Sequence, residues 1–288
     1  MASLKEIKLR VASVKSTEKI TSAMKIVSSS RLHHAEGLSD HTLAYTTNLG
    51  SLLDNLLSSG EDDLSSPYLE KREVKRVAII PVSSSSGLCG AFNSNVWKEL
   101  NARIDFYKQA GAEVKIYSVG KKVSDSAVKA GFSVDATFMQ IGVHPAFASA
   151  EELANKLMKA FEDKEIDKVE LIYHHFKNRG RQILTTREWL PMEPLQKKEA
   201  DEKQTEYFFE PSVSSLLKRL LPKMLHMDIY TTLLDASTSE HAARVLAMQT
   251  ANDNANDLIS DLTLQYNKTR QQSITNELLD IVGGSVNR

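Results

Sequence analysis

The stretch TANDNANDLISDLTLQYNKTRQQSITNELLDIVGG, from Thr250 to Gly284, decides the fold that we predict for this chain. It contains no proline, and its two glycines stand at its very end. Apolar residues recur at helical spacing from Ala255 to Tyr266, but beyond Tyr266 they become too sparse for a self-supporting core. A lone helix of this kind gains little from packing. We therefore expect a long helix whose end is held by something outside the chain.

The same periodicity reaches back to about Pro211. Leu217, Leu220, Met224 and Met227 follow one another at steps of three and four residues. Pro222 should kink this helix or mark its first turn, because proline lacks a backbone N–H. At 1.5 Å per residue a nearly continuous helix would be about 110 Å long, far longer than the usual helix of a compact domain.

A second long helix is predicted at the other end, from Ser3 to about Leu57. This stretch has no proline, and its only glycines are Gly37 and Gly50. Its apolar residues form a stripe that drifts rather than a strict heptad. The stripe comprises Ile7, Val11, Val14, Ile20, Met24, Val27, Leu38, Tyr45, Leu49, Leu52, Leu53 and Leu56. The helix would be about 80 Å long.

The middle of the chain changes its period. Residues 58–74 form a linker that begins with SSGEDDLSSP, and in 75–210 short β-branched runs alternate with helical segments. We expect strands at 75–84, 112–120, 132–139, 167–176 and 182–192, and helices at 93–111, 121–131 and 149–165. This alternation predicts a Rossmann-like α/β domain with a mostly parallel sheet. No helix separates the last two strands, so they should pair antiparallel at an edge.

The two long helices have one obvious arrangement. If residues 1–57 and 211–288 pair as a long antiparallel coiled coil, they bury their stripes on each other. The α/β domain would then sit at one end of the rod. On these lengths the C-terminal helix outruns its partner by roughly 30 Å. The overhang is the stretch quoted above, so an enclosing partner is expected there.

Composition limits the classes of protein. The 288 residues carry a formal net charge of −1, which argues against a general nucleic-acid binder. One cysteine, Cys89, excludes a disulfide framework and suits a reducing compartment. No apolar run approaches the roughly 20 residues of a membrane span, and the start MASLKEIKLRV lacks the apolar core of a signal peptide. We expect a protein made and used in the cytoplasm.

The sequence offers only weak evidence for a phosphate-binding, nucleophilic or metal-binding site. The turn SSSSGLCGAFNSN, Ser83–Asn95, matches no phosphate-binding motif, and a tight turn capped by Asn or Ser is the favoured interpretation. A lone cysteine with no assigned histidine partner is more often a small buried hydrophobic residue than a nucleophile, and we interpret Cys89 in this way. The pairs His33-His34 and His174-His175 cannot chelate alone, since neighbours project apart on helices and strands. We expect no catalytic, metal or cofactor site.

The first 31 residues are strongly basic. They carry Lys5, Lys8, Arg10, Lys15, Lys19, Lys25 and Arg31 against only Glu6 and Glu18. This basic band is either a solvated helix face or a surface for an acidic partner. Nucleic acid is a poorer candidate, because aromatic residues are not interleaved with the charges. Met24 lies among these charges, and coiled-coil packing is its simplest role.

Two long stretches resemble the gamma subunit of F-type ATP synthases. IKLRVASVKSTEKITSAMKIVSSSRL, Ile7–Leu32, resembles the N-terminal helix of that family. SEHAARVLAMQTANDNANDLISDLTLQYNKTRQQSITNELLDIVGG, Ser239–Gly284, resembles its C-terminal helix. The turn Ser83–Asn95 is similar to the turn after the first strand of its α/β domain. The resemblance spans essentially the whole chain, although the middle matches mainly in element order.

The resemblance implies a rotor of the central stalk. In this family the coiled coil is a shaft inside a ring of alternating alpha and beta subunits. The α/β domain lies at its foot, against the epsilon subunit and the membrane c-ring. Proton flow turns the shaft, and its asymmetric surface drives the catalytic sites of the ring through ATP synthesis or hydrolysis. The chain would be a non-catalytic, peripheral subunit on the cytoplasmic face of the bacterial inner membrane, touching the membrane only through the complex.

The resemblance also implies contacts at single residues. Met24 with Lys19 and Lys25 matches the N-terminal coupling region, beside Arg10 of the basic band, and Arg244 matches an arginine of the facing helix. The upper contacts of the C-terminal helix with the ring are matched by Arg270, Gln271, Thr275 and Glu277. The basic band would face acidic loops of the beta subunit.

This chain departs from the family pattern at two points. Ser86 stands where the family often has an arginine before GLCG, which weakens the match of the turn. The inserted cysteine pair of the plant chloroplast version is absent, so thiol control is not expected. Two alternatives stay open. One is a Rossmann-like ligand-binding domain that dimerises through helical arms, and the other is a nucleic-acid-associated coiled-coil protein, which the charge balance disfavours.

Overall fold

The computed structural model describes residues 3–58, 66–139, 145–192, 210 and 212–286. These fall into two compact units, Met1–Ser29 with Arg244–Arg288, and Ser30–Ala243. Within the described part of the chain, no helix combines the length and the apolar character needed to cross a membrane.

Two helices make up most of the N- and C-terminal segments, as the sequence predicts. α1 spans Leu4–Ser58 and α5 spans Val213–Val286. Pro222 lies inside α5, so the possibility that it marks the first turn is wrong. Proline removes one helical hydrogen bond, but Leu221 and Leu225 beside it are buried. Packing of the apolar face therefore compensates for the lost bond.

The buried face of α1 follows a heptad more closely than the sequence suggests. Steps of four and three connect its buried and half-buried positions: Ile7, Val11, Val14, Glu18, Thr21, Lys25, Ser28, Leu32, Ala35, Ser39, Thr42, Thr46, Leu49, Leu53 and Leu56. A period of about 3.5 residues is that of a left-handed coiled coil. The predicted drifting stripe is wrong. Five of its apolar members are exposed, namely Ile20, Val27, Leu38, Tyr45 and Leu52.

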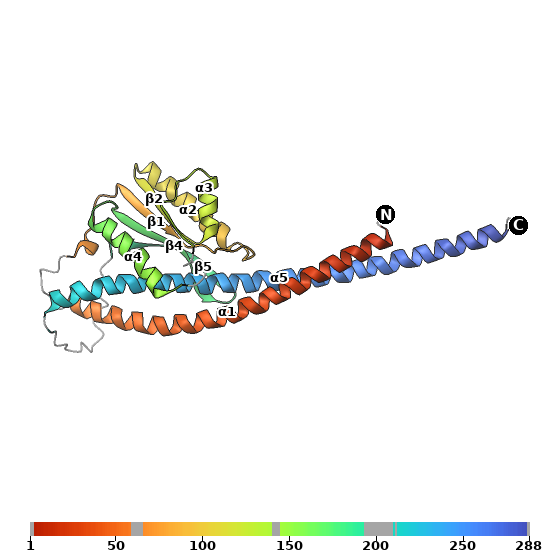
Figure 1. The fold of residues 1–288 in the computed structure, drawn as a ribbon, viewed down its shortest axis with the longest axis horizontal. Helices are drawn as coiled ribbons and strands as arrows, with labels where there is room; N and C mark the ends of the chain where they lie inside the picture. The colour runs from red at the N-terminus through yellow and green to blue at the C-terminus, as the bar shows by residue number, and fades with distance from the viewer. Residues whose placement is uncertain (1–2, 59–65, 140–144, 193–209, 211, 287–288) are drawn as a thin grey trace. The chain divides into compact units, whose positions relative to one another are not determined.

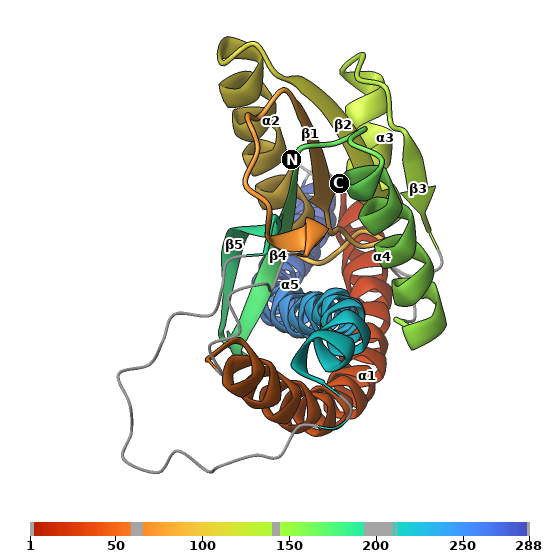
Figure 2. The ribbon, with the colours of Figure 1, turned by 90° about the vertical axis from the view of Figure 1, so that its left-hand side faces the viewer.

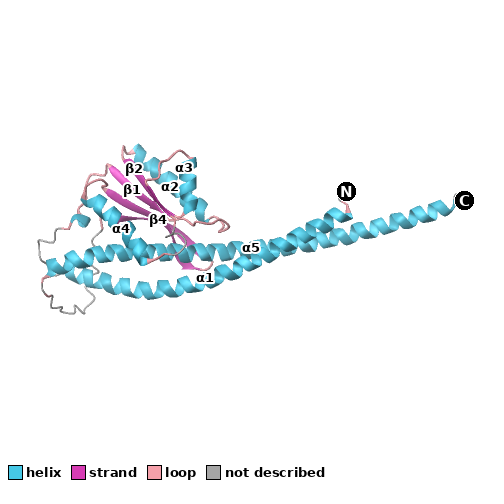
Figure 3. Ribbon diagram, viewed as in Figure 1, coloured by secondary structure: helices cyan, strands magenta, loops and turns pink. Residues whose placement is uncertain are grey.

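The α/β domain holds a five-stranded sheet in the order β3-β2-β1-β4-β5. Figure 3 shows its strands in magenta. The strands are β1 Arg76–Pro81, β2 Glu113–Val119, β3 Ala136–Phe138, β4 Lys168–Asn178 and β5 Arg181–Leu190. The pairings β1–β2, β1–β4 and β2–β3 are parallel, and β4–β5 is antiparallel at an edge, as predicted. The strand expected at 132–139 is too long, because the N–H of Phe132 bonds back to Ala127 at 3.0 Å and closes the preceding helix.

Helices cover both faces of this sheet (Figures 1 and 2). α2 (Phe92–Gln109) and α3 (Lys121–Lys129) pack on one face, in a core with Val77 and Ile79. α4 (Phe147–Glu162) and the first part of α5 pack on the other, in a core with Ala78 and Ile80. Alternate residues of β1 thus serve opposite cores, as expected for a mostly parallel sheet buried on both faces.

Part of the expected linker packs on this domain. The short 3-10 helix η1, Pro67–Leu69, buries Tyr68 in the core beside α4. The Tyr68 hydroxyl bonds to Glu162. Arg72 donates to the carbonyl oxygen of Phe161 at 2.9 Å and lies over the Phe161 ring.

Candidate functional site: a partner-binding surface

The helical unit pairs the start of α1 with the end of α5 (Figure 1). Lys25 donates through Nζ to Oε1 of Gln249 at 2.9 Å. Asn252 donates through Nδ2 to the carbonyl oxygen of Glu18 at 3.2 Å. Residue numbers fall along α1 as they rise along α5, so the helices are antiparallel, as predicted.

The seam of this unit is polar where coiled coils are usually apolar. Thr21 and Ser28 are buried on α1. On α5, Gln249 also donates to Oδ1 of Asp253 at 2.8 Å, which holds its amide in place for Lys25. Polar seam residues fix the register of a coiled coil at a cost in stability. Our sequence analysis missed Gln249, although polar residues at heptad spacing would have been the clue.

The outer surface of α1 carries unburied apolar side chains. Leu9, Ile20, Ile26 and Val27 are each more than half exposed, at 63%, 58%, 65% and 54%. Water-exposed apolar patches of this kind mark surfaces that another protein covers. Ile20 and Val27 lie in the same part of α1 as the basic band defined above. An outer partner of this part of the helix would meet apolar and basic side chains together.

The tip of α5 is unsupported. Beyond Leu262, none of the α5 side chains that the structure describes is buried. α1 begins at Leu4, and Figure 1 shows α5 continuing past that point. Ile274, Leu278, Leu279, Ile281 and Val282 are nevertheless apolar and exposed. The tip is thus more apolar than the sequence analysis suggests, and this apolar surface faces solvent in the isolated chain.

The predicted contact residues are spread along this unit. Arg10 and Lys19 are exposed, Met24 and Lys25 are half-buried, and Arg244 is buried. The tip residues are all exposed: Arg270, Gln271, Thr275 and Glu277. They do not converge on one pocket. A distributed set of this kind suits a partner that encloses the helices.

The α/β domain fills the place where a ligand would bind. In open α/β sheets that place lies beyond the strand ends where the winding direction reverses, which here is between β1 and β4. Phe92 stacks there on His174 with ring centroids 4.4 Å apart, and Ser239 of α5 donates to the His174 carbonyl oxygen at 2.9 Å. Burial lowers the pKa of His174 to about 4, so the ring is neutral near pH 7.

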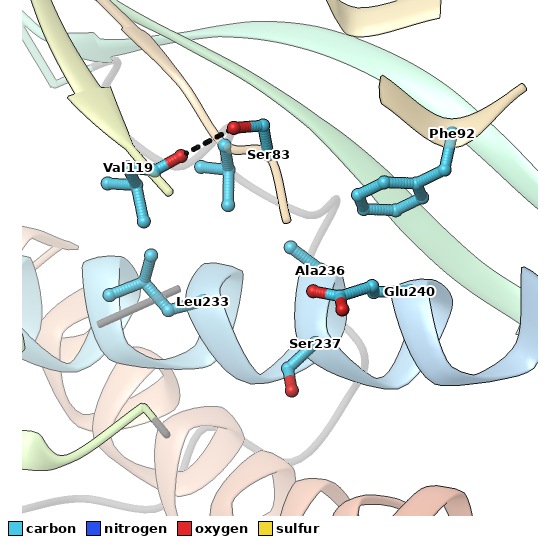
Figure 4. Close-up of a pocket in the computed structure, with 8 residues that line it drawn as sticks. Ser83, Phe92, Val119, Leu233, Ala236, Ser237 and Glu240 are labelled. Carbon is cyan, nitrogen blue, oxygen red and sulfur yellow. Dashed lines mark hydrogen bonds between the residues drawn. The ribbon is translucent and has the colours of Figure 1, made fainter. Parts of the chain in front are cut away.

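A small hollow lies beside Phe92 (Figure 4). Its lining consists of Val82, Ser83, Phe92, Val119, Leu233, Ala236, Ser237 and Glu240. α5 contributes half of these residues, so the helix covers the crevice. Among the described residues, this filled crevice does not favour the alternative of a ligand-binding domain.

Hydrogen bonds within the turn Ser83–Asn95 help to hold its shape. α2 begins here without a side-chain cap, so the expected capping by Asn or Ser is wrong. Instead, Oδ1 of Asn93 accepts from the N–H of Ser84 at 3.0 Å, and Nδ2 lies 3.2 Å from the sulfur of Cys89. Cys89 is only 1% exposed, as expected of a buried hydrophobe. Its thiol is therefore out of reach of a substrate.

The histidine pairs behave as their backbone geometry predicts. His174 is buried, whereas His175 is exposed on the opposite face of β4, with Nδ1 2.6 Å from Oδ2 of Asp235. His33 and His34 are both exposed on α1. Among the residues described, no three His, Cys, Asp or Glu side chains lie close enough to share a metal ion.

Comparisons with known proteins agree on one family. The family model described as "ATP synthase" matches residues 3–286. The ATP synthase gamma chain of Parabacteroides distasonis is 57% identical over 285 residues and 99% of each chain. The ATP synthase gamma chain of Flavobacterium johnsoniae is 44% identical over 99% of this chain and 98% of its own.

Solved structures show a similar fold at low sequence identity. The central stalk with c-ring of the Tetrahymena thermophila mitochondrial ATP synthase contains a chain that is 22% identical, with a TM-score of 0.60. The match covers 81% of this chain and 99% of that one. A rotor chain of the Euglena gracilis mitochondrial ATP synthase is 20% identical with a TM-score of 0.61, over 94% of this chain and 98% of its own.

Proposed function

Because this chain belongs to the ATP synthase gamma chain family, it serves in the central stalk, and we propose that it is the rotor shaft that couples proton flow to ATP synthesis or hydrolysis. Residues 1–57 and 211–288 would form the shaft, with 58–74 as a linker and 75–210 as the foot. The shaft turns inside a ring of alpha and beta subunits. The foot lies against the epsilon subunit and the c-ring.

The observation that carries this proposal is the unsupported tip of α5. Ile274, Leu278 and Leu279 are exposed on the tip of α5, where no other described helix lies beside it (Figure 1). Two features follow if a ring surrounds the tip. Its apolar side chains leave water, and no large apolar core has to be broken as the tip turns. An apolar sleeve also makes few directional bonds, so it opposes rotation weakly.

The start of α1 supports a second contact with the ring. Exposed Arg10 and Lys19 lie on the same helix as exposed Ile20 and Val27. Exposed ion pairs contribute only about 0–1 kcal/mol each, so acidic loops of the beta subunit can bind and release this surface at each step. Met24 and Lys25 would couple the shaft to those loops, together with Arg244, which is buried in the isolated chain. Arg270, Gln271, Thr275 and Glu277 would contact the upper ring.

The chain itself would be non-catalytic. The crevice of its α/β sheet is filled by Phe92, His174 and α5, so we place nucleotide chemistry on the ring subunits. As a peripheral part of a membrane complex, the protein would lie on the cytoplasmic face of the bacterial inner membrane. It would reach the membrane only through the c-ring.

Truncation of α5 tests this function. Deleting everything from Arg270 onward should shift the melting temperature of the free subunit by only a few degrees, because no described side chain beyond Leu262 is buried. In the reconstituted complex the same deletion should lower ATP synthesis in a graded way, since the ring loses its contacts with the tip. The measurements are thermal melting of the subunit and ATP synthesis in vesicles.

A matched short deletion completes the series. Removal of Gly284–Arg288 should leave both melting and synthesis nearly unchanged, because the tip up to Val282 is retained. The proposal fails if the free subunit unfolds on truncation from Arg270 while the assembled complex still makes ATP at the normal rate.

A further inference from the structure

α5 meets the sheet of the unit Ser30–Ala243 through two rows of side chains. The first row is apolar and buried in the core, and it comprises Leu221, Leu225, Ile229, Leu233 and Ala236. The second row comprises Asp228, Thr232, Asp235 and Ser239. These four are spaced by four, three and four residues, so they share one face of the helix. We call this second set the polar row.

The first half of the polar row binds β5 through one arginine. The guanidinium of Arg187 donates two hydrogen bonds to Asp228, at 2.9 and 2.7 Å, and one to Oγ1 of Thr232 at 2.7 Å. Burial lowers the pKa of Arg187, but the neighbouring charge of Asp228 more than offsets this, and the net shift is upward. A bidentate arginine–carboxylate pair fixes direction as well as distance.

The second half of the polar row binds three consecutive residues of β4. Oδ1 of Asp235 accepts from the N–H of Phe176 at 2.7 Å, and Oδ2 lies 2.6 Å from Nδ1 of His175. Ser239 donates to the carbonyl oxygen of His174 at 2.9 Å and is fully buried. Each member of the row thus bonds to the β4–β5 hairpin at the edge of the sheet.

The two rows resist different motions. Apolar burial is non-directional. It opposes separation of α5 from the sheet, but it opposes a roll of the helix about its own axis only weakly. Hydrogen bonds weaken steeply when their angles change. Side chains of the polar row extend outward from the helix axis, so a roll moves their tips and bends these bonds.

We propose that Asp228, Asp235 and Ser239 are positioning residues that lock the α/β domain to α5 against twisting, so that torque passes from foot to shaft through their side chains. This inference rests on the proposed function, in which α5 is the shaft and the α/β domain is the foot. Torque about the shaft is a roll of α5 against the sheet, which is the motion that the polar row opposes.

Two further polar contacts join the described part of the domain to the long helices, and each is a single bond or is exposed to water. On α4, Oδ1 of Asn155 lies 2.7 Å from Nε2 of His226, a single hydrogen bond to α5. Arg179, in the turn of the β4–β5 hairpin, donates two hydrogen bonds to Glu36 of α1, at 3.2 and 2.9 Å, but the Arg179 side chain is 66% exposed. Exposed ion pairs hold weakly because water competes for both charges. The Arg179–Glu36 pair therefore offers a control with the same chemistry outside the polar row.

The test measures how stiffly the foot follows the shaft. In the complete enzyme, a rotation probe is attached to exposed Asp105 of α2 through Asp105→Cys, since the single natural cysteine is buried. The ring is immobilised and held in one state by nucleotide. The angular variance of the probe is then compared among the wild type, the double variant Asp228→Asn/Ser239→Ala, and the control Glu36→Gln.

The double variant should increase the angular variance at least about twofold, because it removes the charge of the bidentate pair and one buried bond. Glu36→Gln should leave the variance unchanged, and ATP hydrolysis should be unchanged in both. If the double variant does not fold, Arg187→Lys replaces it, since lysine keeps the charge and loses the fork. Equal variance in variant and wild type, in an enzyme that rotates, overturns the lock alone. The same wild-type complexes are then released from that state by added ATP, and a probe that does not rotate while ATP is hydrolysed overturns the proposed function and the lock together.

Discussion

Gly120 shows how one position fixes the local backbone. Its φ is +82°, and a Cβ added there would lie 2.0 Å from the carbonyl oxygen of Ser83. Ser83 cannot retreat easily. Its N–H donates to the carbonyl oxygen of Val119 at 2.9 Å, and its hydroxyl accepts from the N–H of Val123 at 3.2 Å. The end of β1, the end of β2 and the start of α3 are thus joined at this glycine.

Gly120→Ala should lower the free energy of unfolding by about 3 kcal/mol or more, because the clash adds to the strain of a positive φ. Gly131→Ala is the matched control. Gly131 has a φ of +83° with nothing within 4 Å of the added Cβ, so it should cost only about 1–2 kcal/mol. Urea denaturation of the two variants gives the comparison. Equal losses would show that the contact with Ser83 is not limiting.

Residue-scale roles were only partly predictable. The sequence places a glycine at the end of the strand predicted at 112–120, but its close approach to Ser83 depends on a neighbour that is 37 positions away in the sequence. The same holds for Asn93, whose side chain holds Ser84 instead of capping the helix. Local propensity indicates a turn, and tertiary contacts decide which groups bond within it.

At the scale of the element, α1 shows why apolar residues alone misplace a seam. Ile20 and Val27 fit a helical stripe in the sequence, yet Thr21 and Ser28 occupy the buried positions beside them. Small polar side chains allow close approach of two helices, and the larger apolar ones are left outside. In an isolated helix pair this arrangement is unfavourable, so the inversion itself points to an outer partner.

Met24→Lys should permit assembly and impair coupling. Met24 is half-buried, and the substitution places a fourth cation among Lys15, Lys19 and Lys25. A new bond to a partly buried carboxylate of the ring could be worth about 1.5–3 kcal/mol, and a bond that must break at every step hinders rotation. Protons pumped per ATP hydrolysed should fall in membrane vesicles.

Met24→Leu is the control for packing, because leucine has a similar volume and no charge. It should pump like the wild type. If Met24→Lys also keeps the normal ratio of protons to ATP, Met24 serves only to pack the helix pair.

The elements differ in how well the sequence predicts them. Long helices are the clearest, because their periodicity repeats over dozens of residues in α1 and α5. The alternation of strands and helices also predicts the parallel sheet and its antiparallel edge. β3 is the exception, since a run of eight strand-like residues, 132–139, forms a strand of only three. The sequence shows that these residues favour an extended backbone. It does not show that the N–H of Phe132, the first of them, bonds to the end of α3.

At the scale of the whole molecule, the sequence alone predicts an enclosing partner, because one terminal helix is longer than the other. Helix lengths and the unsupported tip were enough for that step. The polar row was not predictable, because Asp228, Asp235 and Ser239 look like ordinary solvated positions until Arg187 and β4 are placed against them. Which residues of this chain contact the ring is also not predictable from its sequence, because the other half of each contact belongs to another protein.

Direct observation of rotation tests the central claim most simply. The ring of alpha and beta subunits is fixed to a surface, and a probe is attached to this chain through Asp105→Cys, with the unsubstituted chain as the labelling control because Cys89 is buried. Added ATP should turn the probe in one direction, in steps that stop when ATP is exhausted. A probe that stays still while the same immobilised complexes hydrolyse ATP would contradict the account of this chain as the rotor shaft.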